Sequence, residues 1–322
     1  MWRRRSRRGA AALVALVLSA GAGTAYAAWT ATTGPPAATF SGAPDWSPPA
    51  VTATGIQKAG TNPGYSAGYV RPGGQYYVYA RVTADTGSPA SGILTPGGIT
   101  ANLAGLTTGQ PSAALTSGSY TSQSASYNYR VGPFTVSAAA GSQPYTVSAR
   151  DVAGNSVTTP TQSVVVDGTA PTGADAQGVA VGGTPGKAET GDKLVLSFSE
   201  PIDPSSVILG WDGSSRNVAV RIVNGSKADT IEVWNGSSTI APLGTITLPG
   251  KDYVKSSVDF TASPMALSGS TLTVTLGTTS GASNVTTGSS GPIGWVPTSS
   301  LYDRAGNALS SSTVTGSGDA EF

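Results

Sequence analysis

The chain has 322 residues, of which 43 are Gly and 22 are Pro, while charged residues make up 11% and aromatic residues 7%. This composition is rich in turns and unlike that of a helical protein. The chain contains no cysteine and no histidine. Disulfide scaffolds, thiolate nucleophiles, zinc sites built from Cys or His, and catalytic triads or acid–base catalysis that depend on His are therefore excluded.

The first 27 residues have the layout of a secretory signal peptide. Met1–Arg8 carries five arginines, and Gly9–Ala22 is small, apolar and uncharged. Ala25-Tyr-Ala27 then offers the small-x-small pattern that a signal peptidase needs. We therefore predict a signal peptide over residues 1–27. The alternative is an uncleaved anchor helix, because the apolar run through Ala28 is long enough to cross a tilted bilayer.

The segment 21–30, Gly-Ala-Gly-Thr-Ala-Tyr-Ala-Ala-Trp-Thr, resembles the junction of bacterial proteins that are processed by the SipW type of signal peptidase. The biofilm-fibre family of TasA and camelysin carries such a leader, so the resemblance implies export and leaves a surface-fibre subunit as an alternative. Loss of the five leader arginines leaves 13 basic against 17 acidic residues, a net charge of about −4. Nucleic acid is therefore an unexpected partner, and so is a membrane unless the leader is retained.

Residues 28–50 are rich in Pro, Ala and Thr, and we predict a linker there. Beyond them, short apolar runs alternate with polar residues and are separated by Gly, Pro, Asn and Ser. Period two over half a dozen residues is typical of strands with one buried face. Without helical crossovers such strands pair antiparallel and cover one another, which predicts an all-β fold of β-sandwiches. The predicted strands are 51–56, 76–82, 126–131, 145–150, 163–166, 193–198, 218–223, 230–234, 245–248, 257–260 and 271–276.

The two halves of this strand pattern end with the same Asp-x-Ala-Gly-Asn motif, which predicts two domains, over residues 51–169 and 170–322. Asp151-Val-Ala-Gly-Asn155 lies near the end of the first half and Asp303-Arg-Ala-Gly-Asn307 near the end of the second. We interpret each as a tight hairpin, because Asp accepts backbone N–H bonds and Gly-Asn tolerates positive φ. The stretch 251–297 is longer than a compact domain needs, and we expect an inserted hairpin or loop there.

The run 145–155, together with Val164-Val-Val-Asp-Gly-Thr-Ala-Pro171, resembles the end of a bacterial immunoglobulin-like domain of the kind repeated in surface adhesins. Gly191–Pro204 is similar to the early strand and turn of such repeats. The resemblance implies two tandem Ig-like β-sandwich domains, and it implies calcium at a junction between them. Asp151, Asn155 and Asp167 are the candidate calcium ligands, with Asp192 or Asp303 as partners, although no loop has dense Asp-x-Asp spacing.

Carboxylates are the acid–base groups that the sequence offers for catalysis. Glu200 and Asp203 flank Pro201, which raises the alternative of a hydrolase with two carboxylates. We favour a turn in which Asp203 caps the backbone ahead of Pro204. The acidic residues are scattered singly, so the sequence shows no acidic constellation that stands out.

Aromatic residues raise the alternative of a carbohydrate-binding module, because exposed rings stack on sugars. Tyr77 and Tyr79 are expected to share one strand face and Tyr76 the other, while core packing is the commoner fate of Trp211, Trp234 and Trp295. Taken together, the sequence predicts a secreted, non-catalytic bacterial surface protein with a structural or adhesive role. Its expected partners are other surface proteins or cell-wall or host glycans, and we expect no cofactor other than the calcium already mentioned.

Overall fold

The computed structural model describes residues 45–60, 66–87, 90–239, 243–317 and 321–322. The signal peptide predicted over 1–27 and most of the linker predicted over 28–50 lie outside the described residues. Residues 45–322 form one compact unit. The all-β prediction is confirmed, because the described helices are only the four-residue α1 (Pro204–Val207) and a 3₁₀ turn at Ala282–Asn284. No helix of the described residues is long and apolar enough to cross a membrane.

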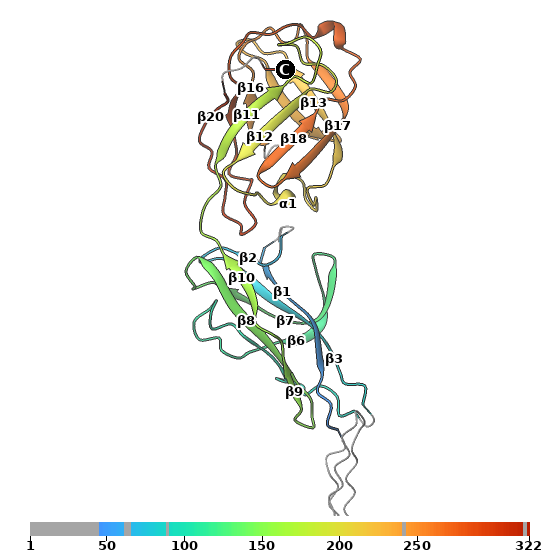
Figure 1. Ribbon diagram of the computed structural model, residues 1–322, viewed down its shortest axis with the longest axis vertical. Coiled ribbons are helices and arrows are strands. Elements are labelled where there is room, and N and C mark those ends of the chain that lie inside the picture. Colours follow the sequence, from blue (N-terminus) through green and yellow to red (C-terminus); the bar gives the residue numbers. More distant parts are fainter. Residues whose placement is uncertain (1–44, 61–65, 88–89, 240–242, 318–320) are drawn as a thin grey trace, which may run out of the picture. The chain divides into compact units, whose positions relative to one another are not determined.

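The first β-sandwich is built from the ten strands β1 to β10 (Figure 1). Their bounds are β1 (Ala50–Lys58), β2 (Tyr69–Val70), β3 (Gln75–Thr83), β4 (Ile99–Asn102), β5 (Ala113–Ala114), β6 (Thr116–Ser122), β7 (Ala125–Thr135), β8 (Gly141–Arg150), β9 (Ser156–Thr158) and β10 (Gln162–Val166). One sheet has the order β1-β3-β7-β6, and the other has the order β2-β10-β8-β4-β5, with β9 paired to β8. β6 is an edge strand, and its pairing with β7 is interrupted by a bulge between Ser117 and Tyr120.

The alternation along β3 explains how the two sheets of this sandwich enclose a core. Tyr76 and Val78 are fully buried, and Val82 is 1% exposed, whereas Arg81 on the opposite face is exposed. The buried side chains pack against Val147 and Ala149 of β8 and the other buried residues of the same core. Removing apolar surface from water stabilises the folded state by about 25 cal/mol per Å². Burial of these alternating apolar side chains is therefore the main contribution to the stability of this core.

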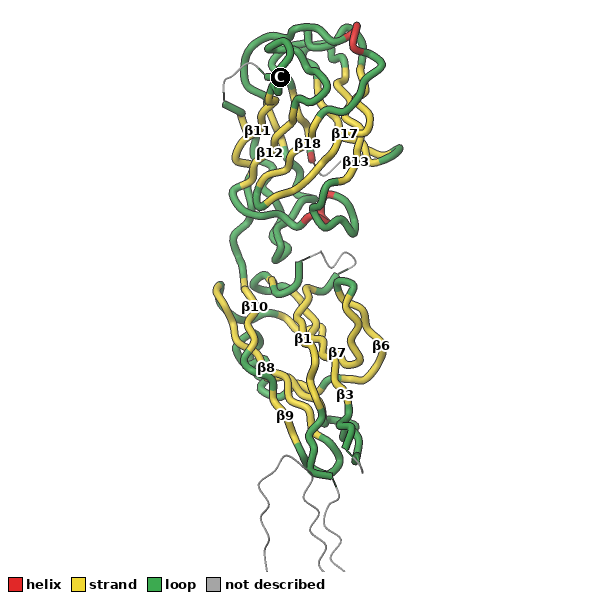
Figure 2. Tube along the Cα trace, turned by 45° about the vertical axis from the view of Figure 1, so that its right-hand side comes forward, coloured by secondary structure: helices red, strands yellow, loops and turns green. Residues whose placement is uncertain are grey.

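The second β-sandwich contains one continuous sheet with the order β11-β12-β18-β17-β13-β14-β16-β19-β20, and β15 pairs with β14 (Figure 2). The bounds of its strands are β11 (Gly173–Val179), β12 (Lys193–Phe198), β13 (Arg216–Val223), β14 (Thr230–Asn235), β15 (Ser238–Thr239), β16 (Thr245–Thr247), β17 (Val258–Ser268), β18 (Thr271–Thr275), β19 (Gly294–Val296) and β20 (Val314–Thr315). The stretch 251–297, where we expect an inserted hairpin or loop, contains the hairpin β17–β18, and β17 pairs with both β13 and β18.

This long sheet folds back on itself, because its two end strands come together over Trp295. A Cβ atom on Gly173 of β11 would lie 2.6 Å from the Val314 side chain of β20 and 2.8 Å from the Trp295 ring. Trp295 itself is fully buried and its ring stands edge-on to Phe198, with centroids 5.3 Å apart. A small residue on β11 and a large one on β19 therefore close the second core.

Candidate metal centre

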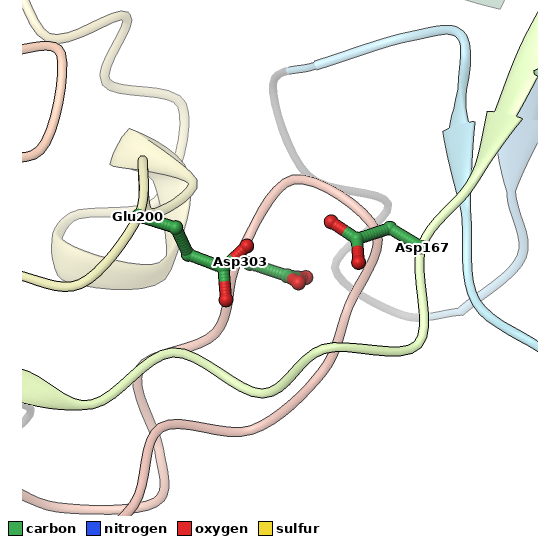
Figure 3. Close-up of side chains that lie close together, drawn as sticks. All are labelled: Asp167, Glu200 and Asp303. Atoms are coloured by element: carbon green, nitrogen blue, oxygen red, sulfur yellow. The ribbon is translucent and has the colours of Figure 1, made fainter. Parts of the chain in front are cut away.

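Three acidic side chains from three separate segments converge at the start of the second β-sandwich (Figure 3). Asp167 follows β10, Glu200 follows β12, and Asp303 lies in the loop before β20. One carboxylate oxygen from each lies within 4.8 Å of one from each of the others. We call these three residues the connector cluster. Acids that are scattered singly in the sequence therefore meet here in the fold.

Asp303 is held in place by the Asp-x-Ala-Gly-Asn loop that the sequence repeats. Its Oδ1 accepts the backbone N–H groups of Gly306 at 2.6 Å and Asn307 at 2.8 Å. The Asn307 amide donates to Asp303 Oδ2 at 2.7 Å and to the backbone carbonyl of Asp167 at 2.9 Å. Gly306 has a φ of 96°, which favours glycine. The predicted turn is thus present, and it also attaches the Asp167 segment to the Asp303 loop.

Glu200 contributes a buried carboxylate oxygen that has no hydrogen-bond partner. Its Oε1 has less than 1 Å² of accessible surface and no hydrogen-bond partner. Burial, followed by the negative charges of Asp167 and Asp303, raises the pKa of Glu200 above its ordinary value. A buried carboxylate oxygen without a donor is costly unless a proton or a cation compensates its charge.

Among the described residues, no ion pair joins a basic side chain to Asp167, Glu200 or Asp303. A lysine does contact residues next to Asp303 and Glu200. Lys58 at the end of β1 pairs with Asp203 at 2.7 Å and donates to the Arg304 carbonyl, also at 2.7 Å. Lys58, however, is committed to Asp203, whose side chain is fully buried. The connector cluster therefore has an excess of negative charge that these ion pairs do not balance.

Asp203 confirms the predicted turn and adds a contact that the sequence did not reveal. Its Oδ1 accepts the backbone N–H of Ser205 at 3.0 Å, which caps α1, and Pro204 occupies the first helical turn. Its Oδ2 binds Lys58. Glu200 and Asp203, the pair considered for hydrolysis, therefore have different surroundings: Asp203 caps a buried helix and pairs with a lysine, whereas Glu200 faces two other acids.

The structure separates the three candidate calcium ligands into two places. Asp151 and Asn155 bind each other, with the Asn155 amide 2.8 Å from Asp151 Oδ2. Asp167 instead belongs to the connector cluster with Asp303, the partner that the sequence suggested. Asp192 is elsewhere, accepting the backbone N–H groups of Val181 and Glu189. The residue that sequence reasoning missed as a candidate ligand is Glu200.

The aromatic residues divide between the cores and the outer faces of the sheets. Tyr76, Trp211 and Trp295 are buried, as core packing predicts. Core packing is wrong for Trp234, which is half-buried with the Arg221 guanidinium 5.1 Å from its ring centroid. Tyr77 and Tyr79 lie together on the outer face of β3, with ring centroids 6.2 Å apart. These rings are largely engaged within the protein: the guanidinium of Arg130 lies 4.4 Å from the Tyr77 centroid and 4.5 Å from that of Tyr120, and Tyr79 is 7% exposed.

Comparison with known proteins gives no relative for this chain. No protein-family model matches it, and no curated protein or solved structure is significantly similar.

Hard oxygen ligands without His or Cys fit a hard divalent cation. Ca²⁺ takes six to eight oxygens at about 2.3–2.6 Å, so two oxygens on opposite sides of one ion lie about 4.6–5.2 Å apart. The 4.8 Å limit that the three carboxylates satisfy is compatible with one shared ion. The donor set also disfavours Zn²⁺, Cu²⁺ and Ni²⁺, which prefer imidazole or thiolate ligands.

Proposed function

We propose that this chain is a secreted, non-catalytic surface protein with a structural or adhesive role, built from tandem Ig-like β-sandwiches that Ca²⁺ holds together at the connector cluster. The observation that supports this proposal best is the convergence of Asp167, Glu200 and Asp303, with a buried and unpartnered oxygen on Glu200. A divalent cation at this point would offset two of the three carboxylate charges and would join three segments of the chain.

The position of the cluster explains why a cation there would serve a mechanical role. Asp167 is the first residue after β10, so it begins the connector that leads into β11. Asp303 belongs to a loop near the end of the second sandwich. An ion shared by both residues fixes where the connector meets the second sandwich. A force applied along the chain must then break metal–oxygen contacts before the connector can move.

An extracellular setting suits such a site. Calcium sites of extracellular modules have dissociation constants on the order of 0.1–1 mM, because the ion is abundant outside cells. We expect the connector cluster to bind in this range. The predicted signal peptide provides the route to that compartment.

Thermal unfolding of the full chain in EDTA and in CaCl₂ tests the calcium part of the proposal. Ligand that binds only the folded state at 100 times its dissociation constant stabilises by about 2.7 kcal/mol, so the midpoint should rise with Ca²⁺. Glu200→Gln keeps the size of the side chain and should remove most of this increase. The matched control is Glu189→Gln, which changes a glutamate paired with Lys187 that is 30% exposed.

Two results would overturn the proposal. One is an equal calcium response in Glu200→Gln and in the wild type, which would show that the connector cluster is not the site. The other concerns location: N-terminal sequencing of native protein from medium and cell-wall fractions should find a start at or near Ala28. A retained Met1 in membranes would contradict the secreted state.

A further inference from the structure

The outer face of the sheet β1-β3-β7-β6 presents a guanidinium group that is held between two tyrosine rings. Arg130 of β7 lies opposite Tyr79 of β3 in the register, so both side chains are on the face that points away from the core. The guanidinium carbon of Arg130 is 4.4 Å from the ring centroid of Tyr77 and 4.5 Å from that of Tyr120. A cation is attracted to the face of an aromatic ring. Two such contacts therefore hold this planar group in place before any ligand arrives.

The edge strand β6 supplies the second ring by means of its bulge. The pairing of β6 with β7 shifts between Ser117 and Tyr120. A Cβ atom on Gly118, inside this bulge, would lie 2.7 Å from the Cζ atom of the Tyr120 ring. No side chain tolerates so close a contact, so glycine makes room for the ring. The bulge and Gly118 together allow Tyr120 to contact Arg130.

Arg130 keeps its charge, in contrast to a similar arginine of the second sandwich. Arg221 also lies over an aromatic ring, 5.1 Å from the centroid of Trp234, but its Nε and Nη2 donate to the Asp259 carboxylate at 2.6 and 2.8 Å. Among the residues that the structure describes, no ion pair reaches Arg130. One ring-stacked arginine is therefore neutralised within the protein, whereas the other is left for an external anion.

Charge is distributed unequally between the two sandwiches. Residues 51–169 contain five basic and three acidic side chains, whereas residues 170–322 contain eight basic and thirteen acidic ones. The strands β1, β3, β6 and β7 contain no acidic residue at all. The sheet that carries Arg130 is therefore a positive surface on a chain that is negative as a whole, and it is complementary to a negatively charged partner.

A second cation and several hydroxyl groups lie on the same face. Arg81 of β3 is exposed, and its guanidinium carbon is 6.0 Å from the ring centroid of Tyr127. Its Nε and Nη2 donate to the backbone carbonyl of Ser126, which leaves its positive charge uncompensated. Tyr77, Tyr120 and Tyr127 are half-buried, so this face offers phenolic groups that donate and accept hydrogen bonds.

We propose that this face binds an acidic polysaccharide, in which one uronic acid carboxylate pairs with Arg130 and another, further along the polymer, with Arg81. Guanidinium groups bind carboxylates through two parallel hydrogen bonds, and sugar hydroxyl groups match the phenolic groups around them. Since Arg130 occupies a face of the Tyr77 and Tyr120 rings, these rings position the cation and do not themselves stack on the sugar. The proposal rests on the proposed function, because it names the partner in the adhesive role.

A second copy of the chain is a poorer match for this face, although its second sandwich is acidic. Asp192, Asp203 and Asp229 are buried, and Glu189 and Asp259 are already paired with basic side chains. These carboxylates are not available to Arg130. The uronic acid groups of a polysaccharide, in contrast, are exposed along an extended polymer.

Isothermal titration calorimetry of the full chain with polygalacturonate, in EDTA at low ionic strength, tests the proposal. Polygalacturonate should bind, its affinity should fall with added salt, and the carboxyl-reduced polymer should not bind. Arg130→Gln should lower the affinity about tenfold or more, because hydrogen bonds to a charged group are lost. Arg130→Lys should lower it less, since lysine keeps the charge but not the two-pronged geometry.

Arg221→Gln is the matched control. It makes the same change in net charge at a ring-stacked arginine that Asp259 already neutralises, and it should leave the affinity unchanged. Tyr120→Leu should weaken binding although the charge remains, because Arg130 loses one of the rings that hold it. Far-UV circular dichroism of each variant establishes that it is folded.

Four results would overturn the proposal: equal binding of the carboxyl-reduced polymer, an unchanged affinity in Arg130→Gln, equally tight binding of poly-L-glutamate, or self-association in sedimentation velocity that Arg130→Gln abolishes. The last would assign the face to a second copy of the chain. Failure of the proposed function is distinguishable, because the titrations contain EDTA and do not depend on calcium. An equal calcium response in Glu200→Gln and the wild type would leave polygalacturonate binding intact.

Discussion

The Asp151 loop and the Asp303 loop share their hydrogen bonds, but they differ in what lies beside them. Next to Ile202 the second sandwich has Asp203, which Lys58 of the first sandwich neutralises. At the equivalent place after Ile93 the first sandwich has Leu94. One loop is therefore secured by an additional buried ion pair and the other is not. The same hydrogen-bonded loop thus occurs once at the entry to the first sandwich and once, with an added ion pair, at the connection between the two sandwiches.

The largest loss of stability is expected when the buried ion pair between Lys58 and Asp203 is broken. Lys58→Met keeps the apolar stem but removes the cation that compensates the buried Asp203 carboxylate, and loss of one partner of a buried pair costs about 3 kcal/mol. Denaturant unfolding measures the loss. Lys187→Met, which breaks a pair with both side chains 30% exposed, should cost less than about 1 kcal/mol.

The double variant Lys58→Met with Asp203→Asn sharpens this result. Asparagine retains an oxygen for the α1 cap while the buried charge disappears, so much of the lost stability should return. A double variant as unstable as Lys58→Met alone would show that the charge is not the cause.

The next largest effect concerns the two asparagines that define the loops. Asn307→Ala removes donors to Asp303 Oδ2 and to the Asp167 carbonyl, and Asn155→Ala removes their equivalents. Each change should cost about 2 kcal/mol of unfolding free energy, because hydrogen bonds to a charged group are lost. A cost in only one of the two variants would contradict the equivalence of the loops.

A smaller loss of stability, equal at the two positions, is expected when Gly154 or Gly306 is replaced by alanine. Gly154 has a φ of 102° and Gly306 a φ of 96°, in the region where a side chain is strained. Alanine at either position meets no atom closer than 3.5 Å, so the cost is conformational and should be about 1 kcal/mol each. Thermal unfolding of the two variants compares them directly, and a difference above about 1 kcal/mol would break the comparison.

The smallest effect is a pH dependence of the cation-free protein. The pKa values of Glu200 and Asp85 are both raised in the folded state, chiefly by burial. The folded protein therefore binds these protons more tightly than the unfolded protein does, and its stability falls as pH rises from about 4 through the raised values. In EDTA, Glu200→Gln and Asp85→Asn should each make that fall shallower, as measured by urea unfolding between pH 4 and pH 7. A steeper fall in either variant would be inconsistent with raised pKa values.

Most of the fold was predictable because the strands that pack the cores carry large alternating side chains. The run 193–198 corresponds residue for residue to β12, and all other predicted runs fall on observed strands. The predicted runs leave out β11 and also shorter or more polar strands, among them β4, β6 and β19. β11 was missed because its residues are small. Gly178 of this strand faces the Phe322 ring, and a Cβ atom there would lie 3.0 Å from it. The small residues are thus imposed by large partners distant in sequence, which no local pattern reveals.

The candidate site was predictable only in part. The repeated Asp-x-Ala-Gly-Asn run marked both loops, and Asp167 and Asp303 were named as possible ligands. Glu200 stood out in the sequence only beside Asp203, as a possible catalytic carboxylate, and not as a metal ligand. The bridge between Ile202 and Asp303, which no local pattern reveals, brings it to the Asp303 loop. The Lys58–Asp203 pair was equally hidden, because its partners belong to different sandwiches and are each an ordinary charged residue in the sequence.

The bulged edge strand β6 has a consequence for how the protein behaves at high concentration. An open, flat and apolar strand edge invites pairing with another molecule, which leads to aggregation. β6 instead carries Thr, Ser, Gly and a single Tyr, and its bulge between Ser117 and Tyr120 disrupts the regular spacing of its backbone groups. Pairing of two molecules through the β6 edge is therefore disfavoured when the protein is crowded.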